Sequence, residues 1–160
     1  MTVMDIRKWV LATAVLTSGC AAADAQSAPF AGLAGRWNGS GTIELSDGPK
    51  ERLRCKASYQ VSHGEARLQQ SLLCASDSYR FELSSDVISQ QGEIAGSWSE
   101  ASRGISGSIV GRESGGSISA VVDAPGFEAR LSVATKGNRQ SFVITSDGDI
   151  RNVNISMSRD

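Results

Sequence analysis

The sequence predicts an all-β fold, a ten-stranded antiparallel up-and-down barrel (a meander) in which each strand pairs with the next along the chain. From residue 35 onward, apolar and polar residues alternate with the period of a half-buried strand. Turn residues interrupt this alternation and leave strands of about 8 to 11 residues. The length of 160 residues suits one such domain.

The first 25 residues predict a secretory signal peptide. Arg7-Lys8 makes a basic start, Trp9–Thr17 is an apolar run too short to cross a bilayer, and Ala23-Asp24-Ala25 has the small-x-small pattern of a cleavage site. We therefore expect export to the periplasm or the exterior. Residues 26–34 are then a short linker, and residues 35–160 form the barrel domain.

Cys20 gives the signal a second interpretation. The segment Leu16–Cys20 resembles the bacterial lipoprotein signal, although that pattern has Leu where Thr17 stands. Lipidation of Cys20 would anchor the protein to the envelope, whereas cleavage after Ala25 would remove this cysteine. In the second case two cysteines remain, an even number in an oxidising compartment.

The first strand is predicted at Gly35–Leu45. Its apolar face carries Trp37, Gly39, Gly41, Ile43 and Leu45. Because this strand comes first, it is the one that the last strand must meet if the sheet closes. Closure would remove the exposed edges that invite aggregation.

The next two strands, Glu51–Val61 and Ala66–Cys74, form a hairpin about Gly64-Glu65 in this interpretation. Matching their apolar faces places Cys55 directly opposite Cys74. Opposed residues of an antiparallel pair have Cα atoms about 4.5 to 5.5 Å apart, within the range that a disulfide accepts. The register therefore predicts a Cys55–Cys74 disulfide.

Seven further runs keep one apolar face and complete the set of strands. They are Tyr79–Leu83, Ile94–Trp98, Ile105–Gly111, Ile118–Val122, Phe127–Val133, Gln140–Ile144 and Val153–Met157. The turns between them predict that Tyr79 lies opposite Cys74, that Leu83 lies opposite Trp98, and that Glu100 lies across from Arg103, where the two would form a favourable pair. Two alternatives stay open, a flattened sandwich and an inside-out barrel with its apolar face toward lipid.

Closing the sheet brings Arg159 of the last strand over Trp37 of the first. Gly35-x-Trp37 with an Arg over the indole resembles the signature of calycins, the lipocalins and related ligand-binding barrels. Gly96-Ser97-Trp98 is in addition similar to avidin-type strands. This resemblance implies that a small apolar or amphipathic molecule binds inside the barrel.

The residues predict no catalytic, cofactor or metal site. His63 is the only histidine and falls in a predicted turn, which excludes a multi-histidine metal site and disfavours a Ser-His-Asp triad. Asp147-Gly148-Asp149 is expected to be a turn and not a calcium loop, because Arg151 stands where a third ligand is needed. The net charge of -1 leaves no basic excess for nucleic acid.

Polar and aromatic residues on the apolar face are the candidate ligand contacts: Trp37, Tyr59, Gln70, Tyr79, Trp98 and Gln140. Buried polar groups need partners, and hydrogen bonds among themselves are the simpler alternative to a ligand. Five glycines on this face either leave room for a cavity or let the sheet bend: Gly39, Gly41, Gly96, Gly107 and Gly111.

We therefore expect an exported, non-enzymatic barrel that binds a small apolar or amphipathic ligand in its interior. The alternative is an envelope structural or protein-interaction module with a solid core, which acts through a basic outer face. That face consists of Arg36, Arg52, Arg54, Lys56, Arg67 and Arg80. An interior void of about 300 Å³ or more would favour the first function.

Overall fold

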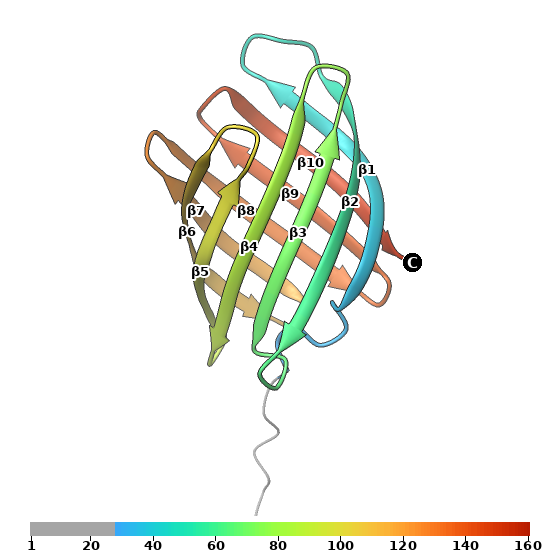
Figure 1. The fold of residues 1–160 in the computed structure, drawn as a ribbon, viewed down its shortest axis with the longest axis vertical. Coiled ribbons are helices and arrows are strands. Elements are labelled where there is room, and N and C mark those ends of the chain that lie inside the picture. The colour runs from blue at the N-terminus through green and yellow to red at the C-terminus, as the bar shows by residue number, and fades with distance from the viewer. Residues whose placement is uncertain (1–27) are drawn as a thin grey trace, which may run out of the picture.

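The computed structural model describes residues 28–160, and the expected signal peptide and Cys20 lie outside the described residues. Ten antiparallel strands close into a barrel in which neighbours along the chain pair and β10 returns to β1 (Figure 1). The strands are β1 (Gly35–Leu45), β2 (Glu51–Ser62), β3 (Arg67–Ala75), β4 (Arg80–Gln90), β5 (Glu93–Glu100), β6 (Ile105–Ser114), β7 (Ser117–Ala124), β8 (Phe127–Lys136), β9 (Arg139–Ser146) and β10 (Ile150–Arg159). No helix within residues 28–160 has the length and apolar character needed to span a bilayer.

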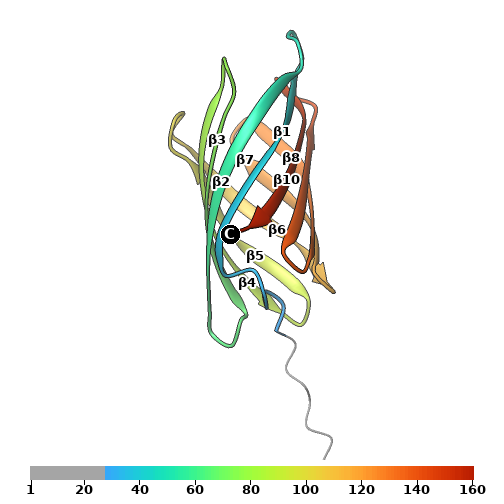
Figure 2. The same ribbon diagram turned by 90° about the vertical axis from the view of Figure 1, so that its right-hand side faces the viewer.

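This architecture confirms the predicted all-β meander and decides between the alternatives. The hydrogen-bonded ladder is continuous around the barrel, so the strands do not form two separate sheets, although the barrel is flattened in side view (Figure 2). Trp37, Ile43 and Leu53 on the inward face have exposed fractions of 0 to 1%. The apolar face therefore encloses the core, in contrast to the inside-out alternative.

The pairing of β1 with β10 has the register expected from the apolar faces. Gly39 lies opposite Met157, and Trp37 lies opposite Arg159. A Cβ atom at Gly39 would overlap the carbonyl oxygen of Ser156 on β10, and the four other inward glycines meet a neighbouring strand in the same way. These glycines therefore let the strands approach closely as the sheet bends, and they do not leave room for a cavity.

The β2–β3 hairpin also confirms the predicted register. Cys55 lies directly opposite Cys74 with a Cα–Cα distance of 4.1 Å, and the two residues form the predicted disulfide. His63, Gly64 and Glu65 in the turn all have positive φ (53°, 63° and 66°), which reverses the chain within three residues. Matching the apolar faces of β2 and β3 was therefore sufficient to predict this disulfide.

The predicted register of β3 with β4 is wrong by two residues. Cys74 lies opposite Phe81, not opposite Tyr79. The reason is a turn over residues 76–79, in which the Ser76 hydroxyl accepts the Tyr79 N–H (2.9 Å) and the Ser76 N–H donates to the Tyr79 carbonyl (2.8 Å). Serine side chains favour such local turns, and this one moves the reversal one residue along the chain.

The predicted register of β4 with β5 is wrong in the same way. Trp98 lies opposite Ser85, not opposite Leu83. Gln91 and Gly92 form a two-residue turn with positive φ at both positions (54° and 82°), as a type I′ hairpin requires. Because a shift of two residues keeps every side chain on its own face, neither error changes which residues point into the barrel.

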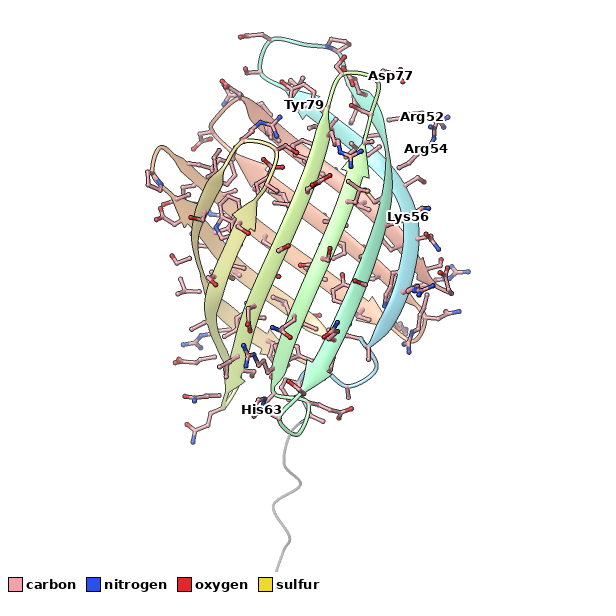
Figure 3. All side chains as sticks on the ribbon, in the orientation of Figure 1. Arg52, Arg54, Lys56, His63, Asp77 and Tyr79 are labelled. Carbon is pink, nitrogen blue, oxygen red and sulfur yellow. A yellow bond between two sulfur atoms is a disulfide. The ribbon has the colours of Figure 1, made fainter. Side chains whose placement is uncertain are left out.

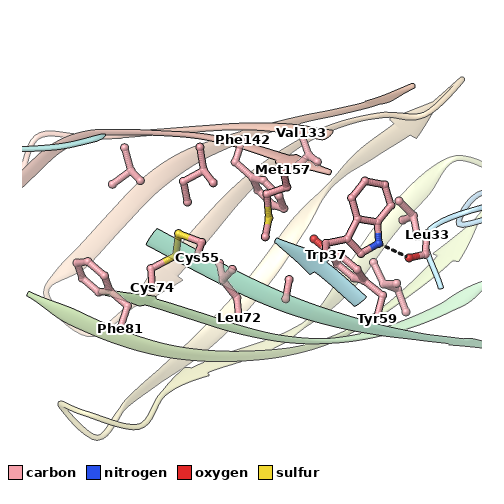
Figure 4. Packing of buried hydrophobic residues seen from close by; sticks show 14 of the residues in the cluster. Leu33, Trp37, Cys55, Tyr59, Leu72, Cys74, Phe81, Val133, Phe142 and Met157 are labelled. Atoms are coloured by element: carbon pink, nitrogen blue, oxygen red, sulfur yellow. Dashed lines mark hydrogen bonds between the residues drawn. A yellow bond between two sulfur atoms is a disulfide. The ribbon is translucent and has the colours of Figure 1, made fainter. Parts of the chain in front are cut away.

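Residues 28–34, which were expected to belong to a linker, pack into one end of the barrel. Phe30 is 0% exposed and Leu33 is 5% exposed. The Trp37 indole N–H donates to the Leu33 carbonyl (2.9 Å; Figure 4). The Phe30 N–H donates to the Glu65 carbonyl (3.1 Å). We call this end of the barrel, where β1 begins, the Trp37 end, and the opposite end, where β5 finishes, the Trp98 end.

Candidate functional site

The six residues predicted to contact a ligand lie in two separate groups. The half of the barrel toward the Trp37 end holds Trp37, Tyr59, Gln70 and Gln140. The Trp98 end holds Tyr79, beside the start of β4, and Trp98, on β5. The structure therefore does not assemble the six residues into one site.

Polar side chains in the Trp37 half satisfy one another. The Tyr59 hydroxyl donates to Oε1 of Gln140 (2.7 Å) and accepts from Nε2 of Gln70 (3.4 Å). Nε2 of Gln140 donates to the Thr135 hydroxyl (2.9 Å), and the Ser85 hydroxyl donates to Oε1 of Gln70 (3.0 Å). Burial raises the pKa of Tyr59, and this effect exceeds the opposite effect of its two hydrogen bonds, so the hydroxyl stays protonated.

The network agrees with the simpler of the two sequence interpretations, which was internal hydrogen bonding. Sequence reasoning missed Thr135 and Ser85, although extending the alternation along β8 and β4 places both on the inward face. With its polar atoms paired, this half of the interior offers a ligand few free donors or acceptors.

The predicted closing pair, Trp37 and Arg159, is present in the structure. The Arg159 guanidinium carbon lies 5.0 Å from the centroid of the Trp37 ring. The same guanidinium donates to the carbonyl of Gly32 and to that of Gly137 (3.2 Å). One side chain thus joins β10 to the N-terminal turn, the β8–β9 turn and the core tryptophan.

The Trp98 end differs because several of its inward apolar residues remain partly exposed, although Ile43, Leu53 and Phe81 in the same half are buried. Eight partly buried residues of the core cluster lie in this half: Leu45, Tyr79, Leu83, Trp98, Val122, Leu131, Ile144 and Ile150. Tyr79 stacks on Phe81 with ring centroids 5.8 Å apart, and Trp98 contacts Phe127 at 5.7 Å. Aromatic and aliphatic side chains thus surround this end of the barrel, in reach of solvent.

A fixed cation lies at the rim of the Trp98 end. The Arg103 guanidinium carbon lies 5.5 Å from the Tyr79 ring centroid and 5.2 Å from that of Phe81. Nη1 of Arg103 also pairs with the Glu100 carboxylate at 3.5 Å. The predicted β5–β6 register is nevertheless wrong by two residues, because Glu100 lies opposite Ile105 and not opposite Arg103. The sequence offered no signal that this arginine would also lie over two aromatic rings, because the wrong β3–β4 register placed them elsewhere.

Glu100 holds this arrangement from a buried position, since only 5% of the residue is exposed. Its carboxylate accepts the backbone N–H groups of Glu82 (3.0 Å), Ser102 (3.1 Å) and Arg103 (2.8 Å). Burial alone would raise the pKa of Glu100, but these hydrogen bonds outweigh it and the net shift is downward. The carboxylate is thus ionised near neutral pH and orders the β5–β6 turn that carries Arg103.

Two of the hollows in the described part of the chain are well enough formed to compare with a ligand pocket. One of about 190 Å³ lies at the Trp37 end between the N-terminal turn and Glu113, Ile118 and Thr135. The other, of about 440 Å³, is a shallow groove on the outer face of β1–β3. The first is smaller than the roughly 300 Å³ expected of a ligand pocket, and the second lies outside the barrel.

No group of three or more His, Cys, Asp or Glu residues within residues 28–160 is placed to hold a metal ion. His63 is exposed and lies in the β2–β3 turn, where the sequence predicted it, with Nδ1 3.2 Å from the Ser62 hydroxyl.

Neither a protein-family model nor a curated protein matches this sequence. Two solved structures have a similar fold. Rv2717c from M. tuberculosis superimposes with a TM-score of 0.65 at 14% identity, covering 81% of this chain and 94% of that one. The S-type phycobiliprotein lyase CPES from Guillardia theta gives a TM-score of 0.54 at 10% identity, covering 82% and 90%. At these identities the likeness shows the fold alone, and the fold of this chain is a closed ten-stranded antiparallel barrel.

Proposed function

We propose that the protein binds a small amphipathic molecule at the Trp98 end of its barrel. The observation that carries this proposal is that eight inward residues of the Trp98 half are partly exposed, whereas only Val61 and Ile118 of the core cluster are so in the Trp37 half. Covering apolar surface that water still reaches is favourable by about 25 cal/mol per Å². We therefore expect the Trp98 end to bind a ligand with an apolar body more tightly than a fully polar one.

The charge at the rim supports an anionic head group on that ligand. Arg103 projects from a turn that Glu100 orders, and its guanidinium lies over Tyr79 and Phe81. Guanidinium groups favour carboxylates, which they bind with paired hydrogen bonds. The ligand class is thus a small amphiphile with an apolar chain or ring system and a carboxylate.

We further propose that this binding protein is exported and non-enzymatic. The Cys55–Cys74 disulfide supports an oxidising compartment, as does the signal-like sequence of the first 25 residues. The mass of the mature protein tests this proposal. A chain that begins at Gln26 would exclude the lipid on Cys20, a chain that begins with a lipidated Cys20 would place the barrel on the envelope, and an unprocessed chain would contradict export.

The test of binding is a fluorescence titration of residues 26–160 with a dansyl-labelled fatty acid. Val122 and Val121 are neighbours on β7, but Val122 points inward and Val121 is 36% exposed on the outside. We expect Val122→Trp to weaken binding about tenfold or more by filling the Trp98 half, and Val121→Trp to leave the affinity unchanged. Binding that is absent, or equally affected by both substitutions, would contradict the proposal.

The head group is tested with the matching fatty amine, which has the opposite charge. If Arg103 recognises the head, the acid binds more tightly than the amine, and Arg103→Gln removes this preference. Equal affinity for the two probes would leave the apolar site standing and reject the role of Arg103.

A further inference from the structure

Three cations form a row on the outside of β2. Arg52, Arg54 and Lys56 alternate with inward residues, and all three side chains are exposed (Figure 3). We call these three residues the cation ladder. Since alternate residues of a strand are about 6.6 to 6.8 Å apart, the ladder presents three positive charges at a regular spacing.

The flanks of the ladder are neutral. On β1, the residues opposite Arg52, Arg54 and Lys56 are Thr42, Ser40 and Asn38. On β3, Ala75 lies opposite Arg54 and Leu73 lies opposite Lys56. None of these five paired positions carries an acidic side chain, and Asp77 in the β3–β4 turn lies beside the Arg52 end of the ladder (Figure 3).

The ladder is the larger part of what remains of the basic face that the sequence predicted, together with Arg36 on β1, which lines the groove beside Lys56. Arg67 is neutralised by Asp86 at 2.5 Å, and Arg80 is neutralised by Glu82 at 2.5 Å. Within residues 28–160, the ladder cations make no ion pair and no side-chain hydrogen bond. Three like charges held side by side repel one another, and an anionic partner would relieve this repulsion.

We propose that the cation ladder binds an extended acidic peptide segment of a partner protein, with carboxylates at every second residue. An extended peptide has the same repeat as β2, so carboxylates at alternate positions match the ladder charge for charge. Arginine guanidinium groups bind carboxylates with paired hydrogen bonds. Ser40, Thr42 and Asn38 beside the ladder supply hydroxyl and amide groups for the backbone of the peptide.

The surroundings also determine where the segment ends. The shallow groove of about 440 Å³ continues from Lys56 toward the Trp37 end, between Arg36, Ser58 and Leu73, and it includes Asp160. Because Asp160 repels a carboxylate, the acidic part of the peptide lies from Lys56 toward Arg52. Uncharged side chains of the same peptide then enter the groove.

An anionic bilayer fits this surface less well. The large apolar side chains exposed on the outside of the barrel are Ile88, Val110, Val121 and Val143, and they lie on β4, β6, β7 and β9. The ladder face therefore has no large, fully exposed apolar residue to insert between lipids. Its outward positions on β1, β2 and β3 also carry no aromatic residue on which a base would stack.

The test is the anisotropy of two labelled peptides with residues 26–160 at about 0.01 M salt. One peptide repeats Ser-Glu, and the other has the same composition arranged as Ser-Ser-Glu-Glu blocks. We expect the alternating peptide to bind more tightly, and the affinity to fall at 0.15 M salt because the Debye length decreases from about 30 to about 8 Å. Neutralising the ladder with Arg52→Ser, Arg54→Ser and Lys56→Ser should weaken binding about tenfold.

A second triple variant is the matched control. Arg130→Ser, Lys136→Ser and Arg139→Ser removes the same charge from exposed positions on β8 and β9, and it should change the affinity less than twofold. Melting curves confirm that both variants fold. The proposal would be overturned by equal affinity for the two peptides, or by an equal loss of affinity in the two variants. Tighter binding to phosphatidylglycerol vesicles or to an oligonucleotide than to the alternating peptide would also overturn it. Because the ladder lies outside the barrel, fatty-acid binding at the Trp98 end is measured separately. Either of the two binding proposals can therefore fail while the other holds.

Discussion

The two ends of the barrel are closed by different means. At the Trp37 end, the N-terminal turn inserts Phe30 and Leu33, and Arg159 covers the Trp37 ring. At the Trp98 end, no segment inserts in the described part of the chain, and strands β2 and β3 are joined there by the disulfide. One end is thus sealed by packing, and the other is braced by a covalent bond.

This difference separates stability from access. Packing buries apolar surface and fills space, so the Trp37 end contributes to the core but leaves little room for a ligand. A disulfide constrains the unfolded chain without occupying the mouth of the barrel, so the Trp98 end can keep apolar side chains in reach of solvent. Substitutions at the Trp37 end should therefore mainly lower the free energy of unfolding. Substitutions at the Trp98 end should mainly weaken ligand binding.

The largest expected effect comes from the tryptophan of the packed end. We expect Trp37→Ala to lower the free energy of unfolding by about 3 to 5 kcal/mol, because it leaves a cavity and removes the hydrogen bond to Leu33. Trp98→Ala should lower it by about 1 kcal/mol, since that side chain is partly exposed, and should weaken binding of the dansyl probe instead. Urea unfolding and probe titration measure the two effects, and similar stability losses in both variants would contradict the comparison.

The disulfide should have the next largest effect. The double substitution Cys55→Ser and Cys74→Ser should lower the free energy of unfolding by about 3 kcal/mol, because it releases a loop with a sequence separation of 19 residues in the unfolded chain. In residues 26–160, which contain only Trp37 and Trp98, the fluorescence of Trp98 in a Trp37→Phe background reports whether the Trp98 end loosens first. A variant as stable as the parent would show that the bond does not brace this end.

The buried hydrogen-bond network should have a smaller effect. Tyr59→Phe removes the hydroxyl that donates to Gln140 and accepts from Gln70, and it leaves both amides without this partner in the core. We expect a loss of about 1 to 3 kcal/mol in unfolding free energy. A double substitution with Gln140→Leu should recover part of this loss, and a simple sum of the two single effects would mean that the groups are not coupled.

The same contrast explains what could be predicted from the sequence. Strand positions, the inward face and the Cys55–Cys74 and Trp37–Arg159 pairings followed from a period of two and from the even number of strands. These features depend on alternation alone, and a shift of two residues leaves them intact. The β3–β4 and β4–β5 registers depend on the hydrogen bonds of Ser76 and on left-handed residues in the turns, which alternation does not specify.

The parts of the site that sequence reasoning missed are contacts across the barrel. Phe30 and Leu33 precede the first strand and belong to no alternating run, so their insertion into the core had no periodic signal. Arg103 lies in a turn, and its place over Tyr79 and Phe81 requires the correct β3–β4 register. Tertiary contacts of this kind depend on side-chain geometry between strands, which residue spacing does not contain.

The smallest expected effect concerns the pH dependence of the Trp98 end. The pKa of Glu100 is lowered in the folded protein, so its carboxylate contributes stability above its ordinary value of 4.5, and this contribution is lost as the pH falls through the folded pKa. Glu100→Gln should therefore lower the free energy of unfolding at pH 7 by about 1 kcal/mol or less and flatten its decline below pH 4.5. Glu93→Gln is the control, because that carboxylate is 74% exposed and pairs only loosely with Arg112 at 3.5 Å. If both variants kept the acid dependence of the parent, Glu100 would not order the β5–β6 turn, and Arg103 would lose its fixed place at the rim.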